Sequence, residues 1–170
     1  VKKTAFPRII LPLSTALANF VNFLLTFTVL VIYLLIAGMS FSHLILLPAV
    51  ILTQLALCVG VSLIGSAANV YFRDTEHIVG IMTLAWFFLT PIIYPVSRIT
   101  RALTNAWMEH AAFLNPMSGL VCLYRRVLMN LPLEPVQVSM VWLSVLVAWL
   151  VLPIGVGIFQ KAQVGFGDEL

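Results

Sequence analysis

Residues 69–99 read NVYFRDTEHIVGIMTLAWFFLTPIIYPVSRI, and this stretch decides the fold of the chain. Two long apolar runs meet at a compact charged cluster made of Arg73, Asp74, Glu76 and His77. The second run, Ile78–Val96, has about 19 residues without a charged side chain, enough for a helix rising ~1.5 Å per residue to cross a bilayer. The stretch therefore predicts a cytoplasmic turn followed by a membrane span.

The outer end of this span is interrupted by Pro91 and Pro95. Each proline removes a backbone donor, so the pair breaks or kinks the helix. A break at membrane depth is tolerated where protein or a water-filled cavity covers the freed carbonyl groups. We predict that the break belongs to an outer gate. The alternative is that the prolines only end the span at the interface.

The composition is that of an integral membrane protein. Hydrophobic residues make up 62% of the chain and charged residues 9%, against roughly 25% charged residues in soluble proteins. Several apolar segments of about 20 residues favour helices over the ~10-residue alternating strands of an outer-membrane barrel. The fold class predicted is all-α, and the net charge of +3 is assigned to loops facing anionic membrane lipid, with no nucleic-acid partner.

Four apolar segments are predicted to span the membrane: Ile9–Gly38, Leu44–Val70, Ile78–Val96 and Val136–Gln160. The segment Ser97–Asn115 is too mixed in polarity to cross lipid. Asn115 and Pro116 form a good N-cap and N1 pair that opens a helix of about 14 residues, too short to span. We therefore expect about four transmembrane helices and two short re-entrant or interfacial outer helices.

Basic residues suggest the orientation. Lys2, Lys3 and Arg8 lead directly into the first span, which favours a cytoplasmic N-terminus, and four spans then place the C-terminus on the same side. The sequence predicts a multi-pass protein of the inner (cytoplasmic) membrane. Arginines that fall on the outer side are assigned to head-group or substrate contacts: Arg98, Arg101, Arg125 and Arg126.

A stripe of small and polar residues runs along the second predicted span. Its members recur at helical spacing, with Gly65 beside them: Cys58, Ser62, Ser66 and Asn69. Such a stripe lets membrane helices approach closely. It indicates either packing within the chain or an interface between subunits.

The chemistry of an enzyme is not apparent in the sequence. No predicted span contains Asp, Glu, Lys, Arg or His, which counts against a proton-driven carrier. There is no G-x-x-x-x-G-K-[ST] phosphate loop, so ATP hydrolysis is expected on another subunit. Asp74, Glu76 and His77 are better explained as a solvated, helix-capping loop than as metal ligands. We expect no catalytic residue and no metal site.

Aromatic residues gather near one end of the predicted bundle: Trp86, Phe87, Phe88, Tyr94 and Trp107. Such residues commonly form an interfacial belt. They also fit the lining of a path for a bulky polar substrate, because aromatic faces stack on sugar rings. Both interpretations stay open at this point.

Several motifs occur in an order that resembles the ABC-2 type permeases, most closely the transmembrane subunits of polysaccharide exporters. These motifs are Phe72-Arg73-Asp74 before a span, Pro91-Ile-Ile-Tyr94-Pro95, Leu114-Asn-Pro116 and Tyr124-Arg125. The entry Lys3 with Phe6-Pro7-Arg8 looks like that family's approach to its third span. Phe166–Leu170 is similar to its cytoplasmic C-terminal signature.

The resemblance implies that residues 1–170 are a single transmembrane domain, the C-terminal portion of a six-span permease. It implies a homodimer paired with an ABC ATPase subunit, which carries the ATP and magnesium, and a lipid-linked glycan such as O-antigen, capsule or teichoic acid as substrate. Residues implied in coupling at the inner side are Lys3, Phe6, Pro7, Arg8, Arg73, Asp74 and Glu76. Residues implied at the outer gate or substrate path are Trp86, Phe87, Phe88, Pro91, Tyr94, Pro95, Trp107 and Arg125.

Two alternatives belong to other functional classes. One is a membrane assembly subunit or scaffold that transports nothing. The other is an ABC-2 exporter of drugs or lipids. A response of the ATPase activity to lipid-linked glycan, and not to drugs, distinguishes glycan export from both.

Overall fold

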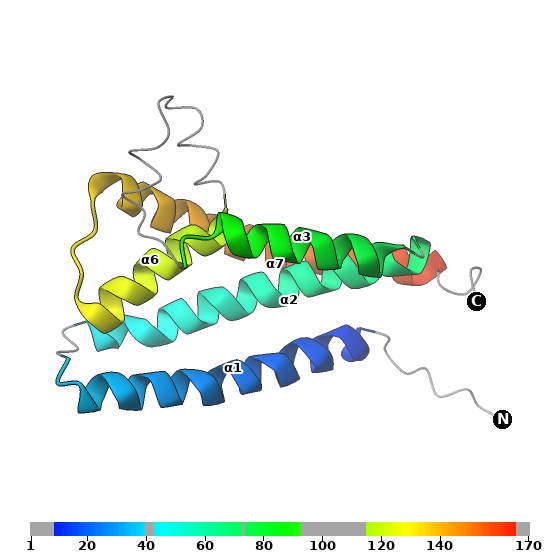
Figure 1. Cartoon of the computed structure of the whole chain (residues 1–170). Helices are drawn as coiled ribbons and strands as arrows, with labels where there is room; N and C mark the ends of the chain where they lie inside the picture. The colour runs from blue at the N-terminus through cyan, green and yellow to red at the C-terminus, as the bar shows by residue number, and fades with distance from the viewer. Residues whose placement is uncertain (1–8, 40–42, 73, 93–114, 166–170) are drawn as a thin grey trace.

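The computed structural model describes residues 9–39, 43–72, 74–92 and 115–165 (Figure 1). Within these ranges the chain is helical and contains no strand. The elements are α1 (Ile10–Ile36), the short 3₁₀ turn η1 (Leu44–Leu46), α2 (Leu47–Tyr71), α3 (Thr75–Leu89), α6 (Pro116–Met129) and α7 (Pro135–Gly165). The predicted all-α membrane bundle is confirmed. Three segments are long and apolar enough to span a bilayer: Ile10–Ile36, Leu44–Tyr71 and Pro135–Gln163.

Helix boundaries follow local capping chemistry. α1 ends before Gly38, whose φ of 75° is readily adopted only by glycine. At the start of α6, the predicted N-cap is confirmed: the Asn115 side chain accepts a hydrogen bond from the Met117 N–H at 3.0 Å. α6 then ends at Asn130, which takes the left-handed conformation with a φ of 54°.

The two ends of the bundle differ in what they contain. α1 begins and α7 ends at one end, where α2 also leads into α3 (Figure 1). We call this the terminal end. At the opposite end, called here the far end, α1 finishes, η1 begins and α6 leads into α7. α3 extends from the terminal end to about halfway, and α6 continues from there to the far end.

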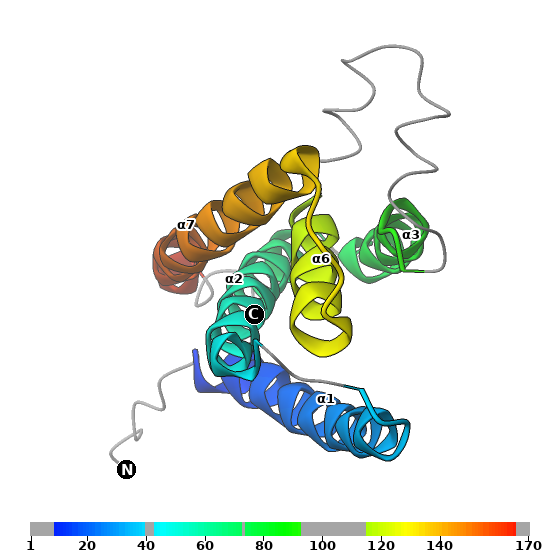
Figure 2. The same cartoon turned by 90° about the vertical axis from the view of Figure 1, so that its left-hand side faces the viewer.

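α2 is the central helix, with α1, α3, α6 and α7 around it (Figure 2). One buried apolar cluster joins α2 and α7 and contains Val59, Leu63, Ala67, Phe159 and Ala162. A second joins α2, α6 and α7 and contains Val50, Leu57, Leu120, Val127 and Ala148. α6 is thus packed inside the bundle as a non-spanning helix, in line with the expected short re-entrant element.

Glycines set the close contact between α2 and α7. A Cβ added to Gly60 would lie 2.8 Å from the carbonyl carbon of Val151, and the backbone of Gly155 faces that of Gly60. The predicted stripe of Cys58, Ser62, Ser66 and Asn69 does not make this contact, and Gly65 beside it opens onto free space. Close approach is therefore made by a different face of α2 from the one that the stripe occupies.

The third predicted span differs most from the structure. α3 has 15 residues, beginning at Thr75 and ending at Leu89, where Ile78–Val96 was expected. The early start arises because Asp74 takes the N-cap position and Glu76 lies in the first turn, where a negative charge favours the helix dipole. The early end precedes Pro91, which lacks a backbone N–H and disfavours the helical conformation in the residue before it, and Thr90 is extended. At ~1.5 Å per residue, α3 is about 22 Å long, short of the ~30 Å hydrocarbon core.

The last span also has different limits from those predicted. α7 runs from Pro135 to Gly165 and passes through Pro153, where Val136–Gln160 had been expected. The apolar run alone set the predicted end, whereas the backbone continues helical into the polar residues that follow.

Candidate functional site

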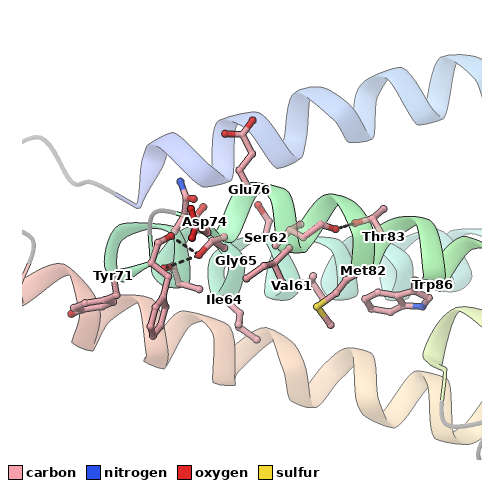
Figure 3. A pocket seen from close by; sticks show the side chains of 17 residues that line it. Val61, Ser62, Ile64, Gly65, Tyr71, Asp74, Glu76, Met82, Thr83 and Trp86 are labelled. Carbon is pink, nitrogen blue, oxygen red and sulfur yellow. Dashed lines mark hydrogen bonds between the residues drawn. The ribbon is translucent and has the colours of Figure 1, made fainter.

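A long groove lies between α2 and α3 (Figure 3). Its volume is about 1010 Å³, and its walls are mostly apolar. The α3 wall includes Ile78, Val79 and Met82, all of them exposed. The α2 wall carries Ser62, Ser66 and Asn69, the members of the small-residue stripe other than Cys58, together with Gly65 beside them. The stripe predicted from the sequence thus faces open space between two helices.

The terminal end of the groove is acidic. Asp74 and Glu76 line it there, and Trp86 lies at its other end (Figure 3). The Asp74 carboxylate makes no capping hydrogen bond to α3, and neither acid is paired with a cation among the described residues. Thr75 instead fastens the α2–α3 turn, because its hydroxyl donates to the Phe72 carbonyl oxygen at 2.7 Å.

The other end of α3 is joined to the start of α6 through one carboxamide. Oδ1 of Asn115 accepts hydrogen bonds from the indole N–H of Trp86 and from the Met117 N–H. Nδ2 of Asn115 donates to the hydroxyl of Thr90 at 2.8 Å, and that hydroxyl donates to the Trp86 carbonyl. A single side chain therefore both caps α6 and holds the end of α3.

Arg125 makes a second connection at this junction. Its Nη2 donates to the Ile92 carbonyl oxygen at 3.0 Å, just after the buried Pro91. Ile92 lies beyond the end of α3 at Leu89, so the hydrogen bonding within α3 does not satisfy its carbonyl group. We call the contacts of Trp86, Thr90, Ile92, Asn115 and Arg125 the α3–α6 junction.

Polar contacts also tie the far half of the bundle together. Tyr124 of α6 donates from its hydroxyl to Oε1 of Gln54 on α2 at 2.6 Å, and its ring packs against Phe27 of α1. Burial raises the pKa of the Tyr124 phenol above its ordinary value, so the hydroxyl stays protonated and able to donate. Arg126 donates to the Leu131 carbonyl at 3.2 Å and lies 3.3 Å from His43 Nε2.

Comparison with known proteins decides the family. Residues 2–129 match the family described as ABC-2 type transporter. This chain belongs to the ABC-2 type transporter family. With three long apolar helices, the ABC-2 chain is a multi-pass membrane protein, and the resemblance drawn from its motifs is confirmed.

Three curated relatives of the ABC-2 chain carry the name O-antigen export system permease protein RfbA. Two are from Klebsiella pneumoniae, 30% and 31% identical over 172 residues and covering the whole chain. The third, from Myxococcus xanthus, is 33% identical over 175 residues and covers 99% of the chain. The ABC-2 chain spans 63% of the length of each of these relatives.

The structure brings together some of the site residues predicted for the ABC-2 chain and separates others. Asp74, Glu76 and Trp86 line one groove. Arg125 contacts the Ile92 carbonyl at the α3–α6 junction, directly after Pro91, and neither Arg125 nor Pro91 lines the groove. Phe87 and Phe88 form an edge-to-face pair with ring centroids 5.5 Å apart and are not part of the groove lining. The remaining predicted residues lie outside the described ranges: Lys3, Phe6, Pro7, Arg8, Arg73, Tyr94, Pro95 and Trp107.

Sequence reasoning missed the second role of Asn115 and the Gln54–Tyr124 pair. The sequence showed Asn115 as a cap. Its contacts to Trp86 and Thr90 join residues 29 and 25 positions apart, and no local pattern reveals such contacts. Gln54 carried a usable signal, because a carboxamide within an apolar span demands a partner. The sequence indicated the close helix contact at Gly60 less clearly, because Gly65 on the same helix is equally small.

Proposed function

We propose that this chain is the permease subunit of an ATP-driven exporter that moves a lipid-linked polysaccharide across the inner membrane. The observation that carries the proposal is the similarity to O-antigen export permeases over 99% to 100% of the chain. ATP binding and hydrolysis then belong to a separate ABC ATPase, and two copies of the permease form the translocation unit.

The attachment of α3 supports a moving role for this helix. It is fastened at the terminal end through Thr75 and at the α3–α6 junction through Asn115, with the groove between. In the proposal, the ATPase acts on the short Phe72–Asp74 link and displaces the terminal end of α3. The junction serves as the pivot, because its hydrogen bonds hold the opposite end.

The orientation proposed places the terminal end in the cytoplasm. α1 begins and α7 ends there (Figure 1), and the basic residues before α1 favour the cytoplasmic side. The acidic end of the groove then faces the ATPase. Arg126 and His43 lie at the far end, on the side where the glycan emerges.

Export and ATPase activity test this proposal together. The permease is deleted from a host that displays the glycan and is restored from a plasmid with its ATPase. We expect surface glycan to disappear and return accordingly, and the ATPase activity of the purified complex to rise with lipid-linked glycan. Stimulation by drugs alone would instead favour a drug exporter, and unchanged surface glycan after deletion would favour an assembly subunit.

A further inference from the structure

A second, smaller cleft lies between α1 and α2, and it shares Ser62 with the lining of the α2–α3 groove. Its volume is about 250 Å³, equal to about eight water molecules of ~30 Å³ each. α1 contributes Thr15, Ala16, Asn19, Phe20 and Phe23, and α2 contributes Gln54, Cys58 and Ser62. The cleft has room for a single sugar ring.

The lining is polar but carries no formal charge. Gln54 uses Oε1 to accept the Tyr124 hydroxyl, and its Nε2 donates to no described residue. The Asn19 carboxamide likewise has no hydrogen-bond partner among the residues that the structure describes. The Thr15 hydroxyl donates to the Leu11 carbonyl of its own helix, which leaves its lone pairs able to accept.

These groups lie in two helices that are long and apolar enough to span the bilayer. Unpaired carboxamides facing hydrocarbon are unfavourable, because lipid offers no hydrogen bonds. A polar occupant of the cleft removes this penalty. Asn19 and Gln54 therefore point to a ligand or to water at membrane depth.

The chemistry of the lining distinguishes between classes of ligand. Phosphate groups and other anions are held by Arg, Lys or helix N-termini, and the described residues that line the cleft include no cation. A metal or organic cation would need carboxylates, and these described lining residues include none. Carboxamides, hydroxyls and the rings of Phe20 and Phe23 line the same cleft, and this combination suits a neutral ring that carries both hydroxyl groups and an apolar C–H face.

Phe23, the lining residue of α1 nearest the far end, makes an aromatic contact with α6. The ring of Phe23 lies edge-on to Tyr124, with centroids 6.4 Å apart, and Tyr124 in turn holds Gln54. The orientation of the Gln54 amide is thus set before any ligand arrives. Pre-set donors lose less entropy on binding than freely rotating ones.

We infer that the α1–α2 cleft binds a neutral sugar ring of the glycan at membrane depth, with Asn19 and Gln54 as the hydrogen-bonding residues. This inference rests on the proposed function for the presence of a glycan. It assigns the glycan a contact surface on α1 and α2 that adjoins the α2–α3 groove at Ser62.

Protection of Cys58 provides a direct test, since this exposed thiol lines the cleft. In a Cys122→Ala background, cells are treated with N-ethylmaleimide while glycan synthesis is switched on or off. Half-occupancy by glycan slows alkylation of Cys58 by about twofold, and we expect at least this effect. The control replaces Leu52, exposed on α2 but outside the cleft, by Cys in a Cys58→Ala, Cys122→Ala background, and its labelling rate should not change.

Two matched substitutions on α1 test the hydrogen bonds. Asn19→Leu removes a carboxamide from the cleft, whereas Asn22→Leu makes the same change one turn away, outside the lining. Leucine suits a membrane span, so both variants should accumulate normally. Loss of one hydrogen bond corresponds to about a tenfold weaker interaction, so we expect export by Asn19→Leu to fall by about that factor and export by Asn22→Leu to stay at the parental rate.

The outcomes separate this inference from the proposed function. Surface glycan that does not depend on the permease contradicts the proposed function itself. Export that does depend on it, together with unchanged Cys58 labelling or equal export by the two asparagine variants, would show that the cleft holds water or lipid and would overturn the inference alone.

Discussion

Helices α3 and α7 both pack against α2, yet they do so in opposite ways. α7 shares a buried apolar cluster with α2 and meets it backbone to backbone at Gly60 and Gly155. α3 is exposed along most of its length, and the hydrogen bonds that join it to other described segments lie near its ends. α2 thus has a fixed side, which faces α7, and an open side, which faces α3. The comparison teaches that the fixed side carries stability and the open side is available for movement.

The largest expected effect comes from placing a side chain between α2 and α7, where the two backbones are in close contact. In Gly60→Leu, the new side chain meets the Val151 backbone, which cannot rotate away as a side chain could. We expect a loss of about 3 kcal/mol or more of stability, measured as reduced abundance and a lower melting temperature in detergent. Gly65→Leu is the matched control, because it opens onto free space, and its stability should change by about 0.5 kcal/mol or less. Equal stability of the two variants would contradict the distinction between the two sides.

The next effect concerns the α3–α6 junction. Asn115→Ala removes the cap of α6 and the bonds to Trp86 and Thr90, so we expect about 1–2 kcal/mol of lost stability and poor export. Asn115→Ser keeps a capping hydroxyl but is too short to bridge to α3. Its stability should stay near that of the parent while export falls. Normal export by Asn115→Ser would show that the junction is not needed as a pivot.

A smaller effect on stability is expected at the acidic end of the groove. Asp74 is exposed and makes no capping bond, so Asp74→Ala should change stability by about 0.5 kcal/mol or less. Export should nevertheless fall if this end receives the motion of the ATPase, and we expect the same of Arg73→Ala. Glu134→Ala, at the far end, is the control and should export normally. Surface glycan and protein abundance are measured together, so that a loss of export is distinguished from a loss of protein.

The smallest effect is expected from cysteine labelling, which reports which end of the bundle faces the cytoplasm. Ser118 is fully buried and therefore a poor labelling site, whereas Leu131 and Gln160 are exposed. Single cysteines at Leu131 and Gln160, in a background without Cys58 and Cys122, should leave export unchanged. An impermeant thiol reagent added outside should modify only the first. Labelling of both from the same side would contradict the proposed orientation.

Much of the fold was predictable because a bilayer imposes strong rules on sequence. Long uncharged runs between polar breaks identified α1, α2 and α7, since lipid excludes charge over a fixed thickness. Asn115-Pro116 marked the start of α6, because capping depends only on neighbouring residues. The predicted limits of α3 were wrong, because hydropathy alone places the start at the apolar run and not at the polar residue Thr75. Asp74 with Glu76 two residues later carried the correct signal.

The site depended on information that no local pattern holds. The sequence by itself placed Asp74, Glu76 and Trp86 around one apolar run, and it identified the small-residue stripe. It did not reveal that the stripe faces an open groove while Gly60 receives α7, because both faces of α2 carry small residues. Nor did it pair Gln54 with Tyr124 or Asn115 with Trp86, which lie 70 and 29 residues apart. Only the packing of several helices around α2 decides such pairs, since each helix must choose one of several apolar faces to bury.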